Sequence, residues 1–319
     1  MRPEVYRVSG LTLESSVSLP ELTPAGGVGP ECRFLLLPSR TPGPASIEWF
    51  HQWRLPDGPL WLGLGRLGQE YLLRFPDLAD FFVSSDGSAV RCQPVPGIPL
   101  ETIRHLLLDQ VIPLVLSQRG RLVLHASAVK VASGGVAFLG MTGEGKSTLT
   151  ASFSQDRFPL LTDDCLVVDD TGGEFLGIPS YPGLRLWPEV IAALFEPEPR
   201  LAPVAHYTRK RRLGKESDRL LFCSDPVPLR RLYVLAPAPG RGEPNAVTIT
   251  PLSPRDTMME LVQYTYCLDI ADREQLRRGF ESLGRAAASR PLCRLTFPRD
   301  LSFLPAVRAA ILQDLDGGR

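Results

Sequence analysis

The sequence has 319 residues, which is enough for one large domain or two ordinary ones. Hydrophobic residues make up 44% and charged residues 22%, and 35 basic side chains balance 35 acidic ones, so a soluble globular protein is expected, with no nucleic-acid or membrane partner. The six cysteines form no Cys-x-x-Cys pair, and no apolar stretch approaches the roughly 20 residues of a membrane span. The first residues also lack the apolar core of a signal peptide, so we expect a reduced, cytoplasmic protein. The sequence leaves open whether the protein forms a homo-oligomer.

Residues 1–97 are expected to form a small β-rich domain, with a role in substrate recognition as a hypothesis. Apolar and polar residues alternate over residues 6–19, as in half-buried strands, and a segment rich in Pro and Gly follows up to residue 30. Further strands are predicted at residues 32–37, 60–64, 70–75 and 80–84. A helix is predicted over residues 100–116, with a kink at Pro113.

Residues 98–319 are expected to form a second domain of the α/β class, because predicted strands and helices alternate there. The strands are predicted at residues 122–130, 136–139, 160–168, 173–178 and 232–235. The helices are predicted at residues 146–153, 188–195, 254–267, 272–288 and 305–315. Residues 196–219 are predicted to be a loop that is longer than a usual connection, and therefore functional or mobile.

A complete phosphate-loop pattern lies at the start of this second domain. Residues 140–147 read Gly-Met-Thr-Gly-Glu-Gly-Lys-Ser, directly after a predicted strand and before a predicted helix. In that context several backbone N–H groups and the positive end of a helix dipole point at one place, which suits phosphate oxygens. Lys146 would bridge the terminal phosphates of ATP, and the Ser147 hydroxyl would ligate Mg²⁺. Nucleotide contacts are expected from Gly140, Thr142, Gly143, Glu144, Gly145, Lys146, Ser147 and Thr148.

Two adjacent carboxylates, Asp163 and Asp164, follow the apolar residues 160–161 downstream of the loop. One of them can hold Mg²⁺, and the other can accept a proton from an attacking hydroxyl. Because neighbouring strand residues point to opposite faces of a sheet, we expect the two acids to have different roles. The alternative is a turn or a cap, where Asp is common.

A single histidine, His125, lies on the predicted strand that precedes the loop-bearing strand. A lone strand histidine is more often a packed residue than a catalytic one, because one backbone hydrogen bond satisfies a neutral imidazole. The residues alone therefore favour a structural role for His125.

The segment of residues 125–164 resembles the core of the HPr kinase/phosphorylase family, bacterial serine kinases with a phosphate loop. His125, Gly134-Gly135, the strand before the loop, the loop itself and Asp163-Asp164 follow the family pattern without a gap. The resemblance implies a kinase core of the HPr kinase type that uses ATP and Mg²⁺. It also implies that Lys146 contacts the phosphates, Ser147 and Asp163 hold the metal, Asp164 is the catalytic acid and base, and His125 lies near the transferred phosphate.

Other segments resemble a divergent branch of this family that includes lasso-peptide kinases. They are residues 6–13 with Leu19-Pro-Glu-Leu22, and residues 181–187, 210–213 and 228–235. The branch implies a peptide or small-protein substrate, such as a lasso-peptide precursor. Two departures separate the chain from HPr kinases themselves: Thr148 stands where they usually have Glu, and the later Gly- and Asn-bearing signature of the dephosphorylation activity is missing. The resemblance therefore does not extend to HPr as the substrate or to the reverse reaction, and both questions stay open.

Basic residues lie close to these motifs in the sequence. Arg209, Lys210, Arg211, Arg212, Lys215 and Arg219 fall in the predicted loop. Such a run is either a solvated loop or a contact to phosphates or to acidic groups of a substrate, and Arg185 could serve likewise.

The favoured function is an ATP-dependent kinase for a serine of a peptide or small protein. The alternatives are a kinase for a small metabolite and a non-enzymatic, nucleotide-gated switch that hydrolyses ATP slowly. A deep pocket beside Asp164 would indicate the metabolite kinase, whereas the switch needs no acid near an acceptor hydroxyl. Chemistry like that of phosphoenolpyruvate carboxykinase would need further metal and oxyacid ligands, which the sequence does not reveal.

Overall fold

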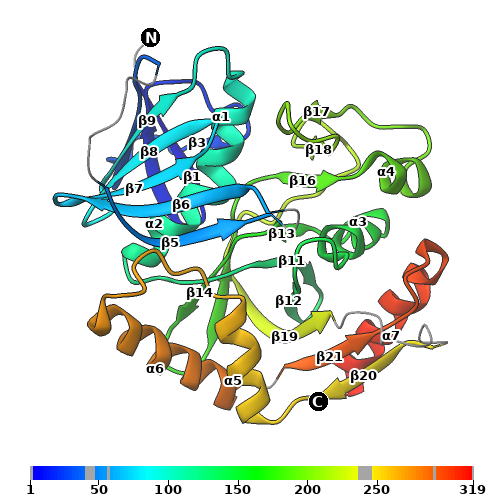
Figure 1. The fold of residues 1–319 in the computed structure, drawn as a ribbon. Helices are drawn as coiled ribbons and strands as arrows, with labels where there is room; N and C mark the ends of the chain where they lie inside the picture. Colours follow the sequence, from blue (N-terminus) through cyan, green and yellow to red (C-terminus); the bar gives the residue numbers. More distant parts are fainter. Residues whose placement is uncertain (1–2, 40–46, 56–57, 236–245, 290–291, 318–319) are drawn as a thin grey trace.

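Three β-sheets and the helices that cover them make up the computed structural model, which describes residues 3–39, 47–55, 58–235, 246–289 and 292–317 (Figure 1). The expectation of a mixed α/β protein is thereby confirmed. No helix in the described ranges is both long enough and apolar enough to cross a bilayer.

The first sheet has nine strands in the order β3-β1-β2-β4-β9-β8-β7-β6-β5 and is drawn in blue to cyan in Figure 1. Its strands are β1 (Glu4–Val8), β2 (Leu11–Ser15), β3 (Thr23–Pro24), β4 (Cys32–Leu36), β5 (Glu48–Arg54), β6 (Leu60–Leu67), β7 (Glu70–Phe75), β8 (Ala79–Ser84) and β9 (Ala89–Pro94). The sequence did not predict β3, β5 or β9. In β5 the reason is visible, because this edge strand exposes Trp49 and Trp53 instead of alternating buried and exposed residues.

The predicted helix after this sheet has three parts: α1 (Leu100–Leu106), a π-helical turn η1 (Leu107–Val111) and α2 (Ile112–Gln118). The Ile112 N–H bonds to the Leu107 carbonyl, five residues back, just before Pro113. Proline has no N–H and its ring crowds the preceding turn, so the irregularity lies where Pro113 predicts it, although it is a widened turn rather than a plain kink. The turn carries Asp109, an acid that is buried in spite of its charge.

One hydrophobic core joins the first sheet to the helix and to part of the second sheet. It contains Leu13 of β2, Leu106 of α1 and Val111 of η1, together with Val167 and Ile178 from the second sheet. The first sheet thus shares its core with the second, and the domain boundary at residue 97 stays a prediction.

The second sheet holds the strands around the predicted phosphate loop. Its main order is β10-β14-β15-β19-β12-β11-β13, and β21 extends it beside β19 and pairs with β20. The strands are β10 (Leu122–Leu124), β11 (Ala126–Val131), β12 (Gly134–Leu139), β13 (Leu160–Thr162), β14 (Leu166–Asp170), β15 (Phe175–Ile178), β19 (Val227–Leu235), β20 (Thr248–Pro251) and β21 (Cys293–Thr296).

Two predicted strands of this sheet are each broken in the structure. Residues 122–130 divide at His125, where the chain changes from pairing with β14 to pairing with β12 and β13. Residues 160–168 divide at 163–165, where the chain changes from β11 to β10. Because β10 and β13 stand at opposite ends of the sheet order and these breaks are short, the sheet curls on itself, and both breaks lie at the join.

Two of the three strands of the third sheet lie within residues 196–219, which the sequence predicted to be a long loop. The sheet has the order β16-β18-β17, with β16 (Gly183–Leu186), β17 (Ala202–Pro203) and β18 (Arg211–Gly214), and α4 (Pro188–Leu194) follows β16. Residues 196–219 are therefore partly ordered as strands, which corrects the loop prediction. Leu184, Leu186 and Leu213 pack with Ala151 in one hydrophobic cluster, which explains why these short strands are held in place.

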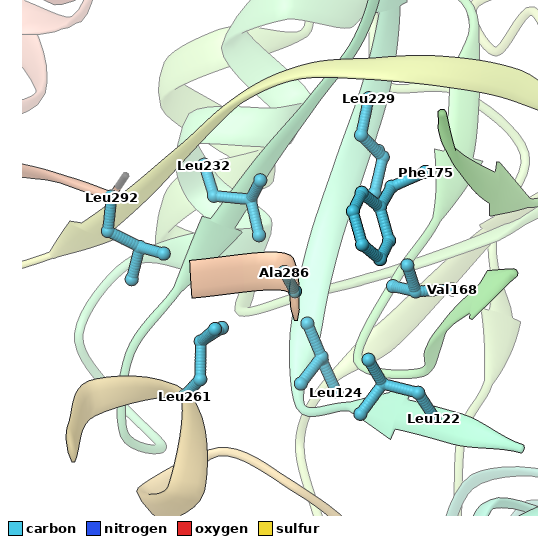
Figure 2. A pocket seen from close by; sticks show the side chains of 9 residues that line it. All are labelled: Leu122, Leu124, Val168, Phe175, Leu229, Leu232, Leu261, Ala286 and Leu292. Carbon is cyan, nitrogen blue, oxygen red and sulfur yellow. The ribbon is translucent and has the colours of Figure 1, made fainter. Parts of the chain in front are cut away.

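Helices cover both sides of the second sheet (Figure 1). They are α3 (Lys146–Gln155), α5 (Pro254–Gln263), α6 (Arg273–Ser289), the short 3-10 turn η2 (Leu301–Phe303) and α7 (Leu304–Gly317). Four of them confirm helices that the apolar pattern predicted. A cavity of about 20 Å³ lies between the sheet and the helices α5 and α6 (Figure 2). Its nine lining residues are apolar, so it is a packing gap of the core and not a site for the predicted chemistry.

Candidate active site

The loop of residues 140–147 connects β12 to α3 in a form that leaves room for an anion. Gly143 and Gly145 have φ angles of +90° and +92°, a region that favours glycine, and nothing lies within 4 Å of where a Cβ would stand on either residue. The helix begins without a side-chain cap. Its first N–H groups therefore have no capping side chain, as expected of a helix start that binds phosphate.

Lys146 is buried at the first position of α3, with 5% of its surface exposed. Its Nζ donates hydrogen bonds to the carbonyl oxygens of Gly140 (2.8 Å) and Met141 (3.2 Å). Burial lowers the pKa of this ammonium, while the nearby charges of Asp164 and Asp163 act in the opposite direction. A lysine that is held by these loop carbonyls can exchange them for phosphate oxygens.

Glu144 also folds back over the loop. Its carboxylate accepts a hydrogen bond from the Met141 N–H at 2.7 Å and lies where a Cβ on Gly140 would collide with it. A side chain at Gly140 would therefore displace the Glu144 carboxylate from its place over the loop. Thr142 is exposed on the loop, and Thr148 is half-buried in the first turn of α3.

Asp163 connects the loop to the second sheet. Its Oδ1 accepts hydrogen bonds from the hydroxyls of Ser147 and Ser127, each at 2.8 Å. Its Oδ2 accepts from the backbone N–H of Arg185 at 3.0 Å. The structure thus brings Ser147 and Asp163, which the sequence predicts to hold a metal together, into direct contact.

A buried arginine, Arg185 on β16, organises the acids. Its guanidinium contacts Asp109 Oδ2 (2.7 Å), Asp164 Oδ2 (3.0 Å), Asp163 Oδ2 (3.4 Å) and the Asp163 carbonyl (2.9 Å). We call Asp109, Asp163, Asp164 and Arg185 the acid–arginine cluster. Arg185 is only 4% exposed, and burial opposes its charge, but the three carboxylates raise its pKa well above the usual range. It is therefore committed to these acids and is not a free contact for substrate phosphates.

Asp109 brings the helix after the first sheet into the cluster. Its side chain also meets His105 Nδ1 at 2.7 Å and accepts a hydrogen bond from the Tyr181 hydroxyl at 2.6 Å. Burial alone would raise its pKa, but the charge of Arg185 and the bonds from His105 and Tyr181 hold the pKa below the usual range. No sequence pattern indicates this role, because Asp109 lies beside an apolar stripe.

Asp164 lies at the exposed side of the cluster, with 26% of its side chain exposed. Burial would raise its pKa, but Arg185, with help from His125 and Lys146, holds the pKa well below the usual range, so the carboxylate is ionised at neutral pH. Its backbone has φ = +71°. This left-handed turn corrects the prediction that the two acids point to opposite faces of one strand, because the strand has ended at Thr162 and both carboxylates reach Arg185.

His125 lies opposite Asp164, at the other break of the sheet. Its Nε2 is 3.5 Å from Asp164 Oδ1, and its ring meets Tyr266 edge-on. Tyr266 also donates a hydrogen bond to the Asp164 carbonyl at 3.4 Å. The imidazole thus faces the acid. The residues alone favoured a structural role for His125, and the family resemblance implied a place near the transferred phosphate, which stays a prediction.

These residues fit a nucleotide with Mg²⁺. In the described ranges no group of three or more His, Cys, Asp and Glu side chains is arranged to hold a metal by itself. Mg²⁺ bound with a nucleotide needs fewer protein ligands, because phosphates and water supply the rest. Ser147 Oγ and Asp163 Oδ1 are two oxygen ligands already side by side, next to the open glycines of the loop.

The basic residues that the sequence placed together are spread over different partners. Arg212 pairs with Glu21 at 3.0 Å, and Lys215 bonds to the Leu22 carbonyl, so both attach the third sheet to the turn before β3. Arg209 pairs with Glu189 in solvent. Lys210 differs from these three residues, because its charge lowers the pKa of the Lys146 ammonium in the loop. Sequence reasoning missed Arg299, which follows β21 and bonds to the Gly143 carbonyl at 3.3 Å.

No protein-family model matches the sequence, and no curated protein matches it. Among solved structures, the chain is similar to the Hpr(Ser) kinase/phosphatase from Coxiella burnetii, over 62% of this chain and 99% of that chain. The sequence identity is 11% and the TM-score is 0.33.

Proposed function

We propose that this protein is an ATP- and Mg²⁺-dependent kinase that transfers the γ-phosphate to a serine hydroxyl of a peptide or small protein. The proposal rests on one observation above all: the Ser147 hydroxyl and the Asp163 carboxylate meet at 2.8 Å, so the loop and the acid pair share one site. A nucleotide switch does not need the second acid, Asp164, held ionised beside that contact.

The residues of this chain suit the steps of phosphoryl transfer. The loop N–H groups and Lys146 bind the phosphates, and Ser147 and Asp163 hold Mg²⁺. When bound, Mg²⁺ supplies neutralisation of the phosphate charge. Asp164 orients the acceptor hydroxyl and takes its proton as the new O–P bond forms, while the bond to the leaving ADP oxygen breaks. Arg185 keeps Asp164 ionised and in place.

His125 has a supporting role in this proposal. It lies 3.5 Å from Asp164 and can hydrogen-bond to the same carboxylate or to a phosphoryl oxygen. The peptide character of the acceptor is supported by the sequence resemblance to the branch that includes lasso-peptide kinases.

The function can be tested with the pure protein, γ-labelled ATP, Mg²⁺ and the short peptides encoded by neighbouring genes. Phosphoserine on one peptide, mapped by mass spectrometry and absent with Asp164→Asn, is the expected result. In a parallel reaction that contains small hydroxyl-bearing metabolites in place of the peptides, label on a metabolite would indicate the metabolite kinase instead. Label that is released only as inorganic phosphate, at the same rate in both proteins, would contradict the kinase and favour a switch.

A further inference from the structure

The third sheet presents two different faces. In an antiparallel pair, residues directly opposite each other share a face, and faces alternate along each strand. Leu184 stands opposite Leu213, and both lie in the hydrophobic cluster with α3. Arg185 stands opposite Arg212, so these two arginines share the other face. That second face is the polar face of the sheet.

The polar face continues one step further, to Trp187 and Lys210. Trp187 lies two positions after Arg185, and Lys210 lies two positions before Arg212. The Lys210 ammonium lies 5.4 Å from the centre of the Trp187 ring, so the two side chains are on the same side of the sheet. Trp187 is 42% exposed. The face therefore runs from a buried pair of arginines to an exposed pair of Trp and Lys.

The charges along this face differ in how they are balanced. Arg185 contacts three carboxylates, and Arg212 pairs with Glu21. For Lys210, the described part of the chain offers the Trp187 ring but no carboxylate within ion-pair distance. A cation on a ring alone is weakly held, because a cation–π contact at an exposed site is worth roughly 0.5–1 kcal/mol.

The polar face leads toward the nucleotide loop. Arg185, two positions before Trp187 on this face, contacts Asp163 Oδ2 at 3.4 Å, and Asp163 Oδ1 accepts the hydrogen bond from the Ser147 hydroxyl of the loop at 2.8 Å. A cation on this face is therefore stabilised when a polyanion binds at the loop. Since Arg185 pairs with the acids and Arg212 with Glu21, Lys210 is the cation of the polar face that has no acidic partner among the residues the structure describes.

We propose that Lys210 is a phosphate-binding residue: with Lys146, it binds the terminal phosphate of a nucleoside triphosphate, and Trp187 holds it within reach beforehand. This deepens the proposed function and rests on it for the identity of the anion. Lys210 forms no covalent bond in the transfer. It donates hydrogen bonds to oxygens whose charge is redistributed as the phosphoryl group moves.

The test compares Lys210→Met with Arg211→Met. The control removes the same charge from the next residue, whose exposed side chain bonds to the Leu201 carbonyl. Calorimetry measures the affinity of each protein for ATP and for ADP, in both cases with Mg²⁺ present. We expect Lys210→Met to weaken ATP binding about 10-fold or more while ADP binding changes by less than about 3-fold, because a hydrogen bond to a charged group is lost only where the terminal phosphate is present. Arg211→Met should change neither by more than about 2-fold.

The outcomes separate this inference from the kinase proposal. If Lys210→Met removes the preference for ATP over ADP, but the parent never labels an acceptor, Lys210 binds the terminal phosphate and the kinase proposal fails. If the parent labels a peptide serine and Lys210→Met keeps both the rate and the ATP preference, the kinase stands and the Lys210 assignment is overturned. A loss of preference with Arg299→Met, and not with Lys210→Met, would also overturn it and assign the role to the arginine at Gly143.

Discussion

The loop and the acid–arginine cluster meet at one hydrogen bond, yet they are built in opposite ways. In the loop, open space lies beside Gly143 and Gly145, and the hydrogen bonds that Lys146 donates within the described residues go to backbone carbonyls. In the cluster, every carboxylate already has a charged partner in Arg185. The loop is thus completed by a ligand, whereas the acids are positioned by the protein itself. Preorganised charge of this kind needs little rearrangement during the reaction.

The largest effect on the transfer rate is expected from a substitution in the loop, which a ligand completes. Lys146→Ala should lower the rate of phosphoryl transfer roughly 10⁴-fold, because it removes the buried cation at the phosphates while the acids stay in place. Single-turnover transfer of labelled phosphate measures this. Lys130→Ala, an exposed lysine on β11, is the control and should keep the parent rate. A transfer-competent Lys146→Ala would show that the loop does not bind the reacting phosphates.

In the acid–arginine cluster, substitutions of the two adjacent acids should have different effects on phosphoryl transfer. Asp164→Asn should lower transfer about 10³-fold and leave ATP affinity within a few-fold, because it removes the proton acceptor only. Asp163→Asn should instead raise the Mg²⁺ concentration needed for activity, since it weakens the oxygen pair with Ser147. Transfer rates over a Mg²⁺ titration separate the two. Parent-like transfer by Asp164→Asn would refute its role as the base.

The cluster should also matter for stability, in contrast to the loop. Arg185→Leu leaves three carboxylates close together without their cation and should lower the free energy of unfolding by about 3 kcal/mol. Urea denaturation measures this. The control Arg209→Leu removes a solvent-exposed arginine and should cost less than about 0.5 kcal/mol. Equal stabilities would mean that Arg185 does not hold the acids together.

The smallest effect concerns pH. The pKa of Asp164 is lowered in the folded protein, so its contribution to stability is fully present above the unfolded-state pKa of about 4 and is lost as the pH falls through the lower folded-state value. The parent should therefore lose stability faster than Asp164→Asn below about pH 4. Part of the acid sensitivity should remain in the variant, because the pKa of Asp109 is lowered as well. Parallel curves from urea denaturation over pH 2–6 would contradict the ion pair with Arg185.

The same contrast explains what the sequence could predict. The loop is a local motif whose glycines, lysine and serine are contiguous, and helix α3 begins at Lys146 as predicted. Helices α5, α6 and α7 also follow from their apolar spacing. The cluster, by contrast, joins residues 109, 163, 164 and 185, and no local pattern connects them. The sequence alone makes Arg185 a candidate for substrate contact, although long-range pairing buries it.

The local sequence pattern also could not predict the two breaks in the strands of the second sheet. Residues 160–168 are apolar on both sides of the acids, which is typical of one continuous strand, and only the exchange of pairing partners divides them. The small third sheet was missed for a similar reason, because its strands are short and lie among prolines and arginines. In both places tertiary pairing decided the structure against the local signal.

The left-handed backbone at Asp164 restricts which residues can replace it. Asparagine tolerates this conformation and glycine adopts it freely, whereas a β-branched residue would be strained. A descendant of this gene that gave up the chemistry but kept the fold would therefore be expected to carry Asn or Gly at position 164, and rarely Val or Ile. The left-handed backbone conformation would thus continue to restrict the residue type at this position after the carboxylate had been lost.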